Sequence, residues 1–160
     1  MKEDYKFSFE VFESSEDLSQ ADKDLVEAAK KATETAYAPY SNFLVGAAAI
    51  LQNGQLVSGS NQENASYPVG TCAERVLLGA AGVLHPDIPI TTMAISYNNI
   101  HGESNRPISP CGMCRQALKE FEDRTKKPIR LILTGKEGKV YVLDAASQLL
   151  PLSFGSTDMK

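Results

Sequence analysis

The three cysteines of this chain stand in two short motifs, and each motif opens a segment rich in helix-forming residues. Cys72 precedes an Ala- and Leu-rich stretch that runs to residue 83, while Cys111 and Cys114 form a Cys-x-x-Cys pair before a helical pattern over 112–124. Such a pair places both sulfurs on one helix face, and a helix N-terminus favours thiolate over thiol. A fold that joins the two helix starts would converge three thiolates on one point.

Three protein ligands with a free fourth position are typical of catalytic zinc, whereas structural zinc sites use all four positions. We therefore expect one Zn²⁺, held by Cys72, Cys111 and Cys114. An odd number of cysteines fits poorly with a disulfide framework and well with reduced thiols. The two histidines, His85 and His101, lack the spacing of a metal site, and we expect both to face solvent.

Glu74 follows Cys72 by two residues, so its carboxylate is expected beside the metal without coordinating it. Zn²⁺ lowers the pKa of a bound water to about 7, and a nearby carboxylate can accept that proton and return it to a leaving group. Cys-x-Glu followed by Pro-Cys-x-x-Cys is a recognised signature of zinc deaminases. Taken alone, the Cys-x-x-Cys pair also fits a redox pair or half of a structural zinc site, and Glu74 a first-turn helix charge.

Arg75 directly follows Glu74, and Arg115 directly follows Cys114. Three thiolates on Zn²⁺ leave one net negative charge, which weakens the effect of the metal on bound water. We hypothesise that one or both arginines donate hydrogen bonds to the sulfurs and withdraw charge from the zinc. Without this context, both would be interpreted as surface residues of their helices.

The order of the expected elements predicts a three-layer α/β sandwich, in which helices cover a mixed, roughly five-stranded sheet. Ser19 is expected to cap a first helix that Pro39 ends, and Asn53-Gly54 is a strong hairpin turn pattern. Asp144 is expected to cap a short last helix before Pro151. The expected strands cover 43–51, 55–60, 92–97, 129–134 and 140–143.

The N-terminal residues carry a pattern of their own. Tyr5, Phe7, Phe9 and Val11 alternate with polar residues, which predicts a strand over 5–11 followed by an acidic, Ser-rich linker. We expect this extra strand to join a sheet edge, within the subunit or across an interface. The chain is accordingly divided into an N-terminal extension, 1–20, and a zinc-binding domain, 21–160.

Composition narrows the range of partners. A net charge of -4 weighs against a polynucleotide substrate, because proteins that bind phosphates usually present a basic face. No segment has the length and apolar character of a membrane span, and the first residues lack the apolar run of a signal peptide. We expect a cytoplasmic protein that binds neither nucleic acid nor membrane.

With these motifs in place, the sequence resembles the cytidine deaminase family, in its small, three-cysteine, homotetrameric branch. The resemblance covers roughly residues 21–160. It rests on six motifs in the family's order: 36–41, 43–48, 61–67, the Cys72 motif, 109–116 and 149–154. It implies hydrolysis of cytidine and 2′-deoxycytidine to uridine and 2′-deoxyuridine, with release of ammonia.

The family likeness also implies substrate contacts. Phe43 would stack on the pyrimidine, Asn61 and Glu63 would bind the ribose 3′-hydroxyl, and Phe154 would reach a neighbouring subunit's site. The sequence pattern alone also fits purely structural roles. Phe43 would then pack in the core, Asn61 and Glu63 would lie in a turn, and Phe154 would anchor the C-terminus on its own core. The remaining implied contacts are Ala65 and Ala73, through their backbone groups, and Tyr67.

Departures from the family pattern leave other functions open. Ser60 and Gln62 stand where the family usually has Cys and an apolar residue, and the loop 98–108 is longer than usual. A relative acting on another small amino-heterocycle or nucleoside analogue is the first alternative. The others are a polynucleotide deaminase, which the acidic charge disfavours, and a catalytically silent zinc-binding protein, which Glu74 disfavours.

Overall fold

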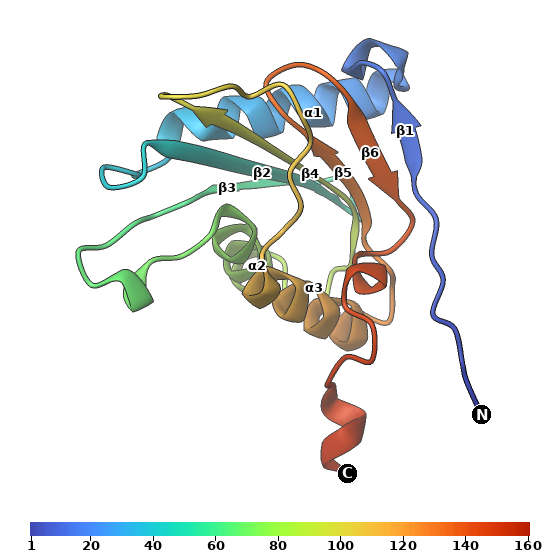
Figure 1. Ribbon diagram of the computed structural model, residues 1–160. Helices are drawn as coiled ribbons and strands as arrows, with labels where there is room; N and C mark the ends of the chain where they lie inside the picture. Colours follow the sequence, from blue (N-terminus) through green and yellow to red (C-terminus); the bar gives the residue numbers. More distant parts are fainter.

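A computed structural model describes all residues, 1–160. One mixed sheet of six strands lies between α1 on one face and α2 with α3 on the other (Figure 1). The strand order is β1-β6-β5-β4-β2-β3, and only β4 and β5 run parallel. The predicted three-layer α/β sandwich is confirmed, and the sixth strand comes from the N-terminal extension. None of the helices combines the length and apolar character needed to span a bilayer.

The helices and strands follow the sequence patterns closely in the middle of the chain. The β2–β3 hairpin turns at Asn53 and Gly54, and Gly54 adopts a φ of 82° that favours glycine. The α-helices are α1 (Gln20–Ala32), α2 (Ala73–Leu84) and α3 (Gly112–Thr125). The strands are β1 (Glu10–Phe12), β2 (Phe43–Leu51), β3 (Leu56–Ser60), β4 (Ile90–Asn99), β5 (Arg130–Thr134) and β6 (Val140–Leu143).

Helix α1 begins as predicted, with the Ser19 hydroxyl accepting from the Asp22 N–H, but it ends at Ala32, well before Pro39. The Thr33 hydroxyl donates to the Lys30 carbonyl over 2.6 Å, and the chain then tightens into a 3₁₀ turn. Side-chain bonds of this kind compete with helix continuation. The prediction that Pro39 ends the helix was therefore wrong.

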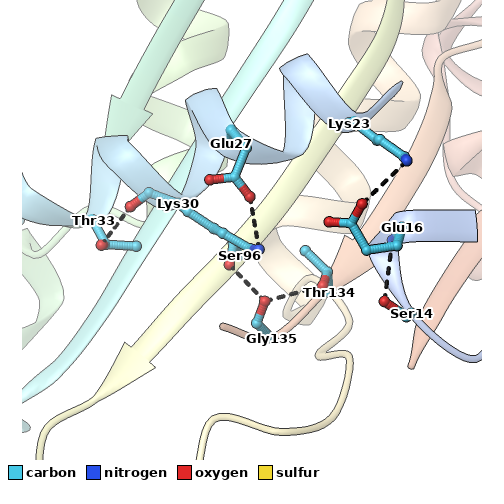
Figure 2. A network of polar contacts seen from close by, with 9 residues as sticks. All are labelled: Ser14, Glu16, Lys23, Glu27, Lys30, Thr33, Ser96, Thr134 and Gly135. Atoms are coloured by element: carbon cyan, nitrogen blue, oxygen red, sulfur yellow. Dashed lines mark hydrogen bonds and ion pairs between the residues drawn. The ribbon is translucent and has the colours of Figure 1, made fainter. Parts of the chain in front are cut away.

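A small polar cluster holds the ends of the two parallel strands together beside α1. Ser96 in β4 and Thr134 at the end of β5 both donate to the Gly135 carbonyl, over 3.1 and 3.0 Å (Figure 2). Because Ser96 and Thr134 are buried, these hydrogen bonds satisfy polar groups that would otherwise be costly to bury. They join β4, which runs on to Asn99, to the end of β5.

The opposite face of the sheet carries the larger core and positions the start of α2. A Cβ on Gly59 would lie 2.6 Å from the Ala73 carbonyl and 2.7 Å from the Leu77 nitrogen. The first turns of α2 therefore rest directly on the β3 backbone, which is possible only because residue 59 has no side chain. This close approach fixes Cys72, which immediately precedes the helix.

The N-terminal strand is shorter than predicted. Only Glu10–Phe12 pair with β6, because β6 ends at Leu143, next to the partner of Glu10. The chain over 1–9 continues alongside the body without strand pairing (Figure 1). The expected linker is more structured than predicted, since Ser14 caps a 3₁₀ turn and Leu18 is buried.

The expected cap at Asp144 was also wrong. The last turn near the sheet is the 3₁₀ helix η4 (Ala146–Leu149), and Ala145 occupies its N-cap position. The Ala146 N–H instead donates to the buried carboxylate of Glu122 in α3, over 2.9 Å. The turn is therefore anchored from α3, which ties it to the second cysteine motif.

Candidate metal centre and active site

The two cysteine motifs meet at the N-termini of two neighbouring helices. Cys72 is the N-cap of α2 and Cys111 is the N-cap of α3, while Cys114 lies in the first turn of α3. The Cys111 sulfur lies 3.8 Å from that of Cys72 and 3.5 Å from that of Cys114. All three sulfurs lie within 4.8 Å of one another. The predicted convergence of the three thiols is confirmed.

The sulfur spacing fits a tetrahedral zinc site. With Zn–S bonds of 2.3 Å, two sulfurs of a tetrahedron stand about 3.8 Å apart. Cys114 is buried, Cys72 half-buried and Cys111 exposed, so the cluster is open on one side. The cluster of cysteines contains no histidine; His101 is exposed, and His85, at the end of α2, is partly exposed. Three sulfurs with an open side fit zinc with a free fourth position.

The three thiols share their protons unequally. A hydrogen bond from Cys114, with smaller contributions from Cys111 and the Arg75 charge, lowers the pKa of Cys72 to about 6 against the effect of burial. The same hydrogen bond, together with burial and the charge of Glu74, raises the pKa of Cys114. Cys72 therefore carries the thiolate, which is the form that binds metal.

Glu74 lies in the first turn of α2 and is only 4% exposed. Burial raises the pKa of its carboxyl, and the negative charge on Cys72 raises it further. A carboxyl group with a raised pKa exchanges its proton more readily near neutral pH, as a general acid/base requires. Position and environment both suit Glu74 to carry protons beside the metal.

The two arginines occupy different places. Arg115 Nε donates to the Pro110 carbonyl and Arg115 Nη1 to the Leu149 carbonyl, both over 2.9 Å. Arg115 thus joins the residue before Cys111 to the end of η4. Arg75 is half-buried and its charge acts on Cys72. Hydrogen bonds from either guanidinium to sulfur stay a prediction.

Phe43 and Asn61 lie together at the start of β2. The Val45 N–H donates to Asn61 Oδ1 over 2.8 Å, and Asn61 Nδ2 donates to the Phe43 carbonyl over 2.9 Å. The Phe43 ring stacks on Tyr97 of β4. Asn61 therefore holds the backbone that presents the Phe43 ring, and the second N–H of its amide is not used in these bonds.

Glu63 lies on the arm that follows β3. Its carboxylate accepts from the Tyr40 N–H over 2.8 Å, from the Ser41 N–H over 3.3 Å and from the Ser41 hydroxyl. Desolvation opposes these bonds, but they hold the pKa of Glu63 below its usual range. A hollow of about 240 Å³ is lined by Tyr40, Ser41, Glu63, Asn64, Tyr67 and Gly70.

The remaining predicted contacts divide into buried and exposed groups. Ala73 is fully buried beside Cys72, whereas Ala65 is exposed on the arm and Tyr67 is 73% exposed. The Phe154 carbonyl accepts from Gln116 Nε2 over 3.1 Å, yet the residue remains 59% exposed. The structure thus gathers the cysteines, Glu74 and Ala73 closely, and leaves Tyr67 and Phe154 on the surface.

Comparison with known proteins places this geometry in a family. Residues 19–128, which include all three cysteines and Glu74, match the model of the cytidine and deoxycytidylate deaminase zinc-binding region. The chain belongs to this family. Within it, Cys72, Cys111 and Cys114 are the residues placed to bind the zinc for which the family region is described.

Other members of the family match most of the chain. A cytidine deaminase of Halalkalibacterium halodurans is 36% identical over 135 residues, covering 84% of this chain and 95% of that protein. The crystal structure of a Burkholderia pseudomallei cytidine deaminase superimposes with a TM-score of 0.72 at 41% identity, covering 86% and 100% of the two chains. A blasticidin-S deaminase of Bacillus cereus is 30% identical over 139 residues, covering 86% and 94%.

Some contacts found in the structure carried no recognisable sequence pattern. Tyr97 ends an apolar strand and gave no sign that it would stack on Phe43. Ser41 bonds the Glu63 carboxylate across 22 residues of chain, which spacing does not predict. Glu122 falls at helical spacing with the apolar face of α3, and this buried position was the one hint of its role in anchoring η4.

Proposed function

We propose that this chain hydrolyses cytidine and 2′-deoxycytidine to uridine and 2′-deoxyuridine and releases ammonia. The observation that carries the proposal is the meeting of three sulfurs, open on one side, with the buried carboxyl of Glu74. A relative whose sequence aligns with 84% of this chain and a solved structure that covers 86% of it both bear the name cytidine deaminase. The rest of the mechanism follows from what the chain's own residues can do.

Glu74 is the proton carrier in this reaction. If Zn²⁺ is held by the three cysteines, it would lower the pKa of a bound water to about 7. As water adds to C4 of the pyrimidine, Glu74 accepts its proton and passes it to N3 of the ring. Glu74 then takes the proton of the new C4 hydroxyl and gives it to the amine, so that the C4–N bond breaks, ammonia leaves and the C4 carbonyl forms. Its raised pKa suits both directions of transfer.

The substrate contacts follow from the groups around Phe43. The Phe43 ring, held from behind by Tyr97, stacks on the pyrimidine. Asn61 donates its unused amide N–H to the ribose 3′-hydroxyl, and Glu63 accepts from that hydroxyl. The backbone groups of Ala65 and Ala73 meet the base edge. Arg75 and Arg115 offset the charge of the thiolates.

The exposed residues around the site support an assembly of several subunits. Tyr67 and Phe154 are mostly exposed, although both are expected to contact substrate. A homotetramer would account for exposed residues that contact substrate. In it, Phe154 reaches the site of a neighbouring subunit and Tyr67 forms part of the pocket wall. The deaminase domain spans 21–160, with 1–20 as an extension. Reduced thiols as ligands favour the cytoplasm.

The deciding experiment follows the fall in ultraviolet absorbance as purified, zinc-loaded protein converts cytidine. Glu74→Gln, with its zinc content verified, should lose about two to four orders of magnitude in kcat, as expected when a general acid/base is removed. Glu120→Gln, an exposed carboxylate on α3, is the matched control and should keep its rate. No turnover by the zinc-loaded parent protein would remove cytidine as the substrate.

A second candidate function is deamination of a nucleoside analogue. It rests on the 30% identity to a blasticidin-S deaminase and on the long loop 98–108. A panel of amino-bearing heterocycles, assayed for ammonia release, distinguishes the two candidates. Faster ammonia release from an analogue than from cytidine would favour this second function.

A further inference from the structure

The N-terminal segment 1–9 lies outside the part of the chain that matches the deaminase family, yet it carries a continuous row of aromatic rings. The ring centroids of Tyr5 and Phe7 are 6.4 Å apart, and those of Phe7 and Phe9 are 6.3 Å apart. Phe9 continues the row onto Tyr141 of β6, at 5.0 Å. The segment is therefore packed on the body although it forms no strand.

These rings lie beside η4 and the loop that precedes Cys111. Phe7 and Phe9 line a hollow of about 150 Å³ together with Ser109, Leu133, Tyr141, Leu143 and Leu149. The Tyr5 hydroxyl donates to the Gln148 carbonyl of η4 over 3.2 Å. The aromatic row thus shares a hollow with Ser109, two residues before Cys111, and is bonded to η4 through Tyr5.

Arg115 connects these same two places from the inside. Its guanidinium donates to the carbonyls of Pro110 and Leu149, so it spans from the residue before Cys111 to the end of η4. Cys111 is the one exposed cysteine of the three. Cys111 joins an exposed loop to the start of α3, and it is held only as firmly as the residues that brace that loop, because exposed loops open locally at low cost.

We propose that Phe7 and Phe9, with Tyr5, are positioning residues for the second half of the metal site. Through the hollow that they line together with Ser109 and Leu149, they restrain the loop that presents Cys111 and the turn to which Arg115 is bonded. Loss of the rings frees this loop, and the exposed Cys111 sulfur detaches from bound zinc more often. The inference rests on the zinc site and not on the identity of the substrate.

The test measures how fast zinc leaves the full-length, zinc-loaded protein in excess chelator at neutral pH. The double variant Phe7→Ser/Phe9→Ser should release zinc about tenfold faster, the lower end of the effect of removing groups that orient metal ligands. Val11→Ser is the matched control, because Val11 is 49% exposed, against 45% and 46% for the two Phe residues, and does not line the hollow. Phe7→Leu/Phe9→Leu should restore slow release. Equal rates in all four proteins would overturn the proposal.

Amide hydrogen exchange of the metal-free proteins separates positioning from general stability. In Phe7→Ser/Phe9→Ser, exchange should accelerate over 108–115 and 146–150 and stay unchanged in the β2–β3 hairpin. Faster exchange throughout the sheet would mean that the rings only stabilise the fold, and would overturn the positioning role. Neither measurement uses cytidine, so failure of the proposed reaction and failure of this inference are told apart.

Discussion

The rings of Phe43 and Tyr97 lie stacked, with centroids 4.9 Å apart and planes inclined by 14°. The two residues belong to neighbouring strands, since Val45 pairs with Tyr97 and Phe43 with Asn99. Phe43 and Tyr97 are thus diagonal neighbours on the sheet face that carries α2 and α3. Tyr97 is 3% exposed whereas Phe43 is partly open, so Tyr97 forms the back of the surface on which a base would stack.

Replacing Tyr97 should weaken substrate binding more than it slows chemistry. An aromatic pair is worth about 0.5–1.5 kcal/mol, so loss of the stack in Tyr97→Leu should raise KM for cytidine by about twofold to tenfold. The kcat should change less, because Tyr97 lies behind Phe43 and not at the sulfurs or Glu74. Steady-state kinetics on the zinc-loaded protein measure both constants. Tyr97→Phe keeps the stacked ring and is expected to match the parent; a rise in its KM would contradict the explanation.

The Cys72 thiol should ionise well below the usual range in the metal-free protein. Its pKa of about 6 in the folded state lies below the 9.0 of a free thiol. The stability that this thiolate contributes is therefore present above the unfolded pKa and is lost as pH falls through about 6. Thiolate absorbance near 240 nm should show this midpoint in the parent protein and lack it in Cys72→Ser.

The same titration tests the role of Arg75. The Arg75 charge helps to lower the pKa of Cys72, so Arg75→Gln should move the midpoint upward. Lys31→Gln removes an exposed cation from α1, on the other face of the sheet, and should leave the midpoint in place. An unchanged midpoint in Arg75→Gln would contradict an electrostatic role for Arg75.

The metal site was predictable because the residues within each of its two motifs lie close together in the sequence. Cys72, Glu74, Cys111 and Cys114 sit at two helix starts, where local spacing alone fixes their orientation. The β2–β3 hairpin was predictable for a similar reason, since the Asn53-Gly54 turn and the apolar pattern agree. Local spacing cannot predict contacts between residues that are distant in the sequence. Examples are the stacking of Tyr97 on Phe43 and the hydrogen bond from Ser41 to Glu63.

The errors occurred where a distant partner sets the end of an element. The alternation over 5–11 predicts a strand, but pairing stops at Glu10 because β6 ends at Leu143. Asp144 has the chemistry of a cap, yet the Glu122 carboxylate, 24 residues before Ala146, supplies the acceptor for that turn. In both cases the sequence pattern was sound and the tertiary partner decided the outcome.

Glu122 should be important for stability although it lies away from the sulfurs. Its buried carboxylate accepts from the N–H groups of Ile129, Ala146 and Ser147, over 2.8, 2.9 and 3.3 Å. Hydrogen bonds to charged groups contribute about 1.5–3 kcal/mol each. Glu122→Gln keeps one acceptor oxygen and loses the charge, so we expect a loss of about 2–4 kcal/mol in the free energy of unfolding.

Urea unfolding of the zinc-loaded proteins measures this loss. Glu120→Gln, on the same helix but exposed, should unfold within about 0.5 kcal/mol of the parent protein, as surface substitutions usually do. If Glu122→Gln were as stable as Glu120→Gln, the anchoring of η4 by this carboxylate would be refuted.

A last prediction concerns how closely α1 lies on the sheet. A Cβ on Gly46 of β2 would stand 2.2 Å from the Ala29 carbonyl and 2.7 Å from the Thr33 nitrogen. Both atoms belong to the backbone and cannot rotate away, so Gly46→Ala must push the helix off the strand and should cost about 3 kcal/mol. Gly79→Ala is the matched control, because nothing lies within 4 Å of that position in α2 and alanine favours helix by about 0.5–1 kcal/mol. Urea unfolding should therefore move the two midpoints in opposite directions. Since α1 and the sulfurs lie on opposite faces of the sheet, Gly46→Ala should lower stability and leave the zinc content of the folded protein unchanged. Equal unfolding midpoints for the two variants would mean that α1 does not rest on β2 as closely as described.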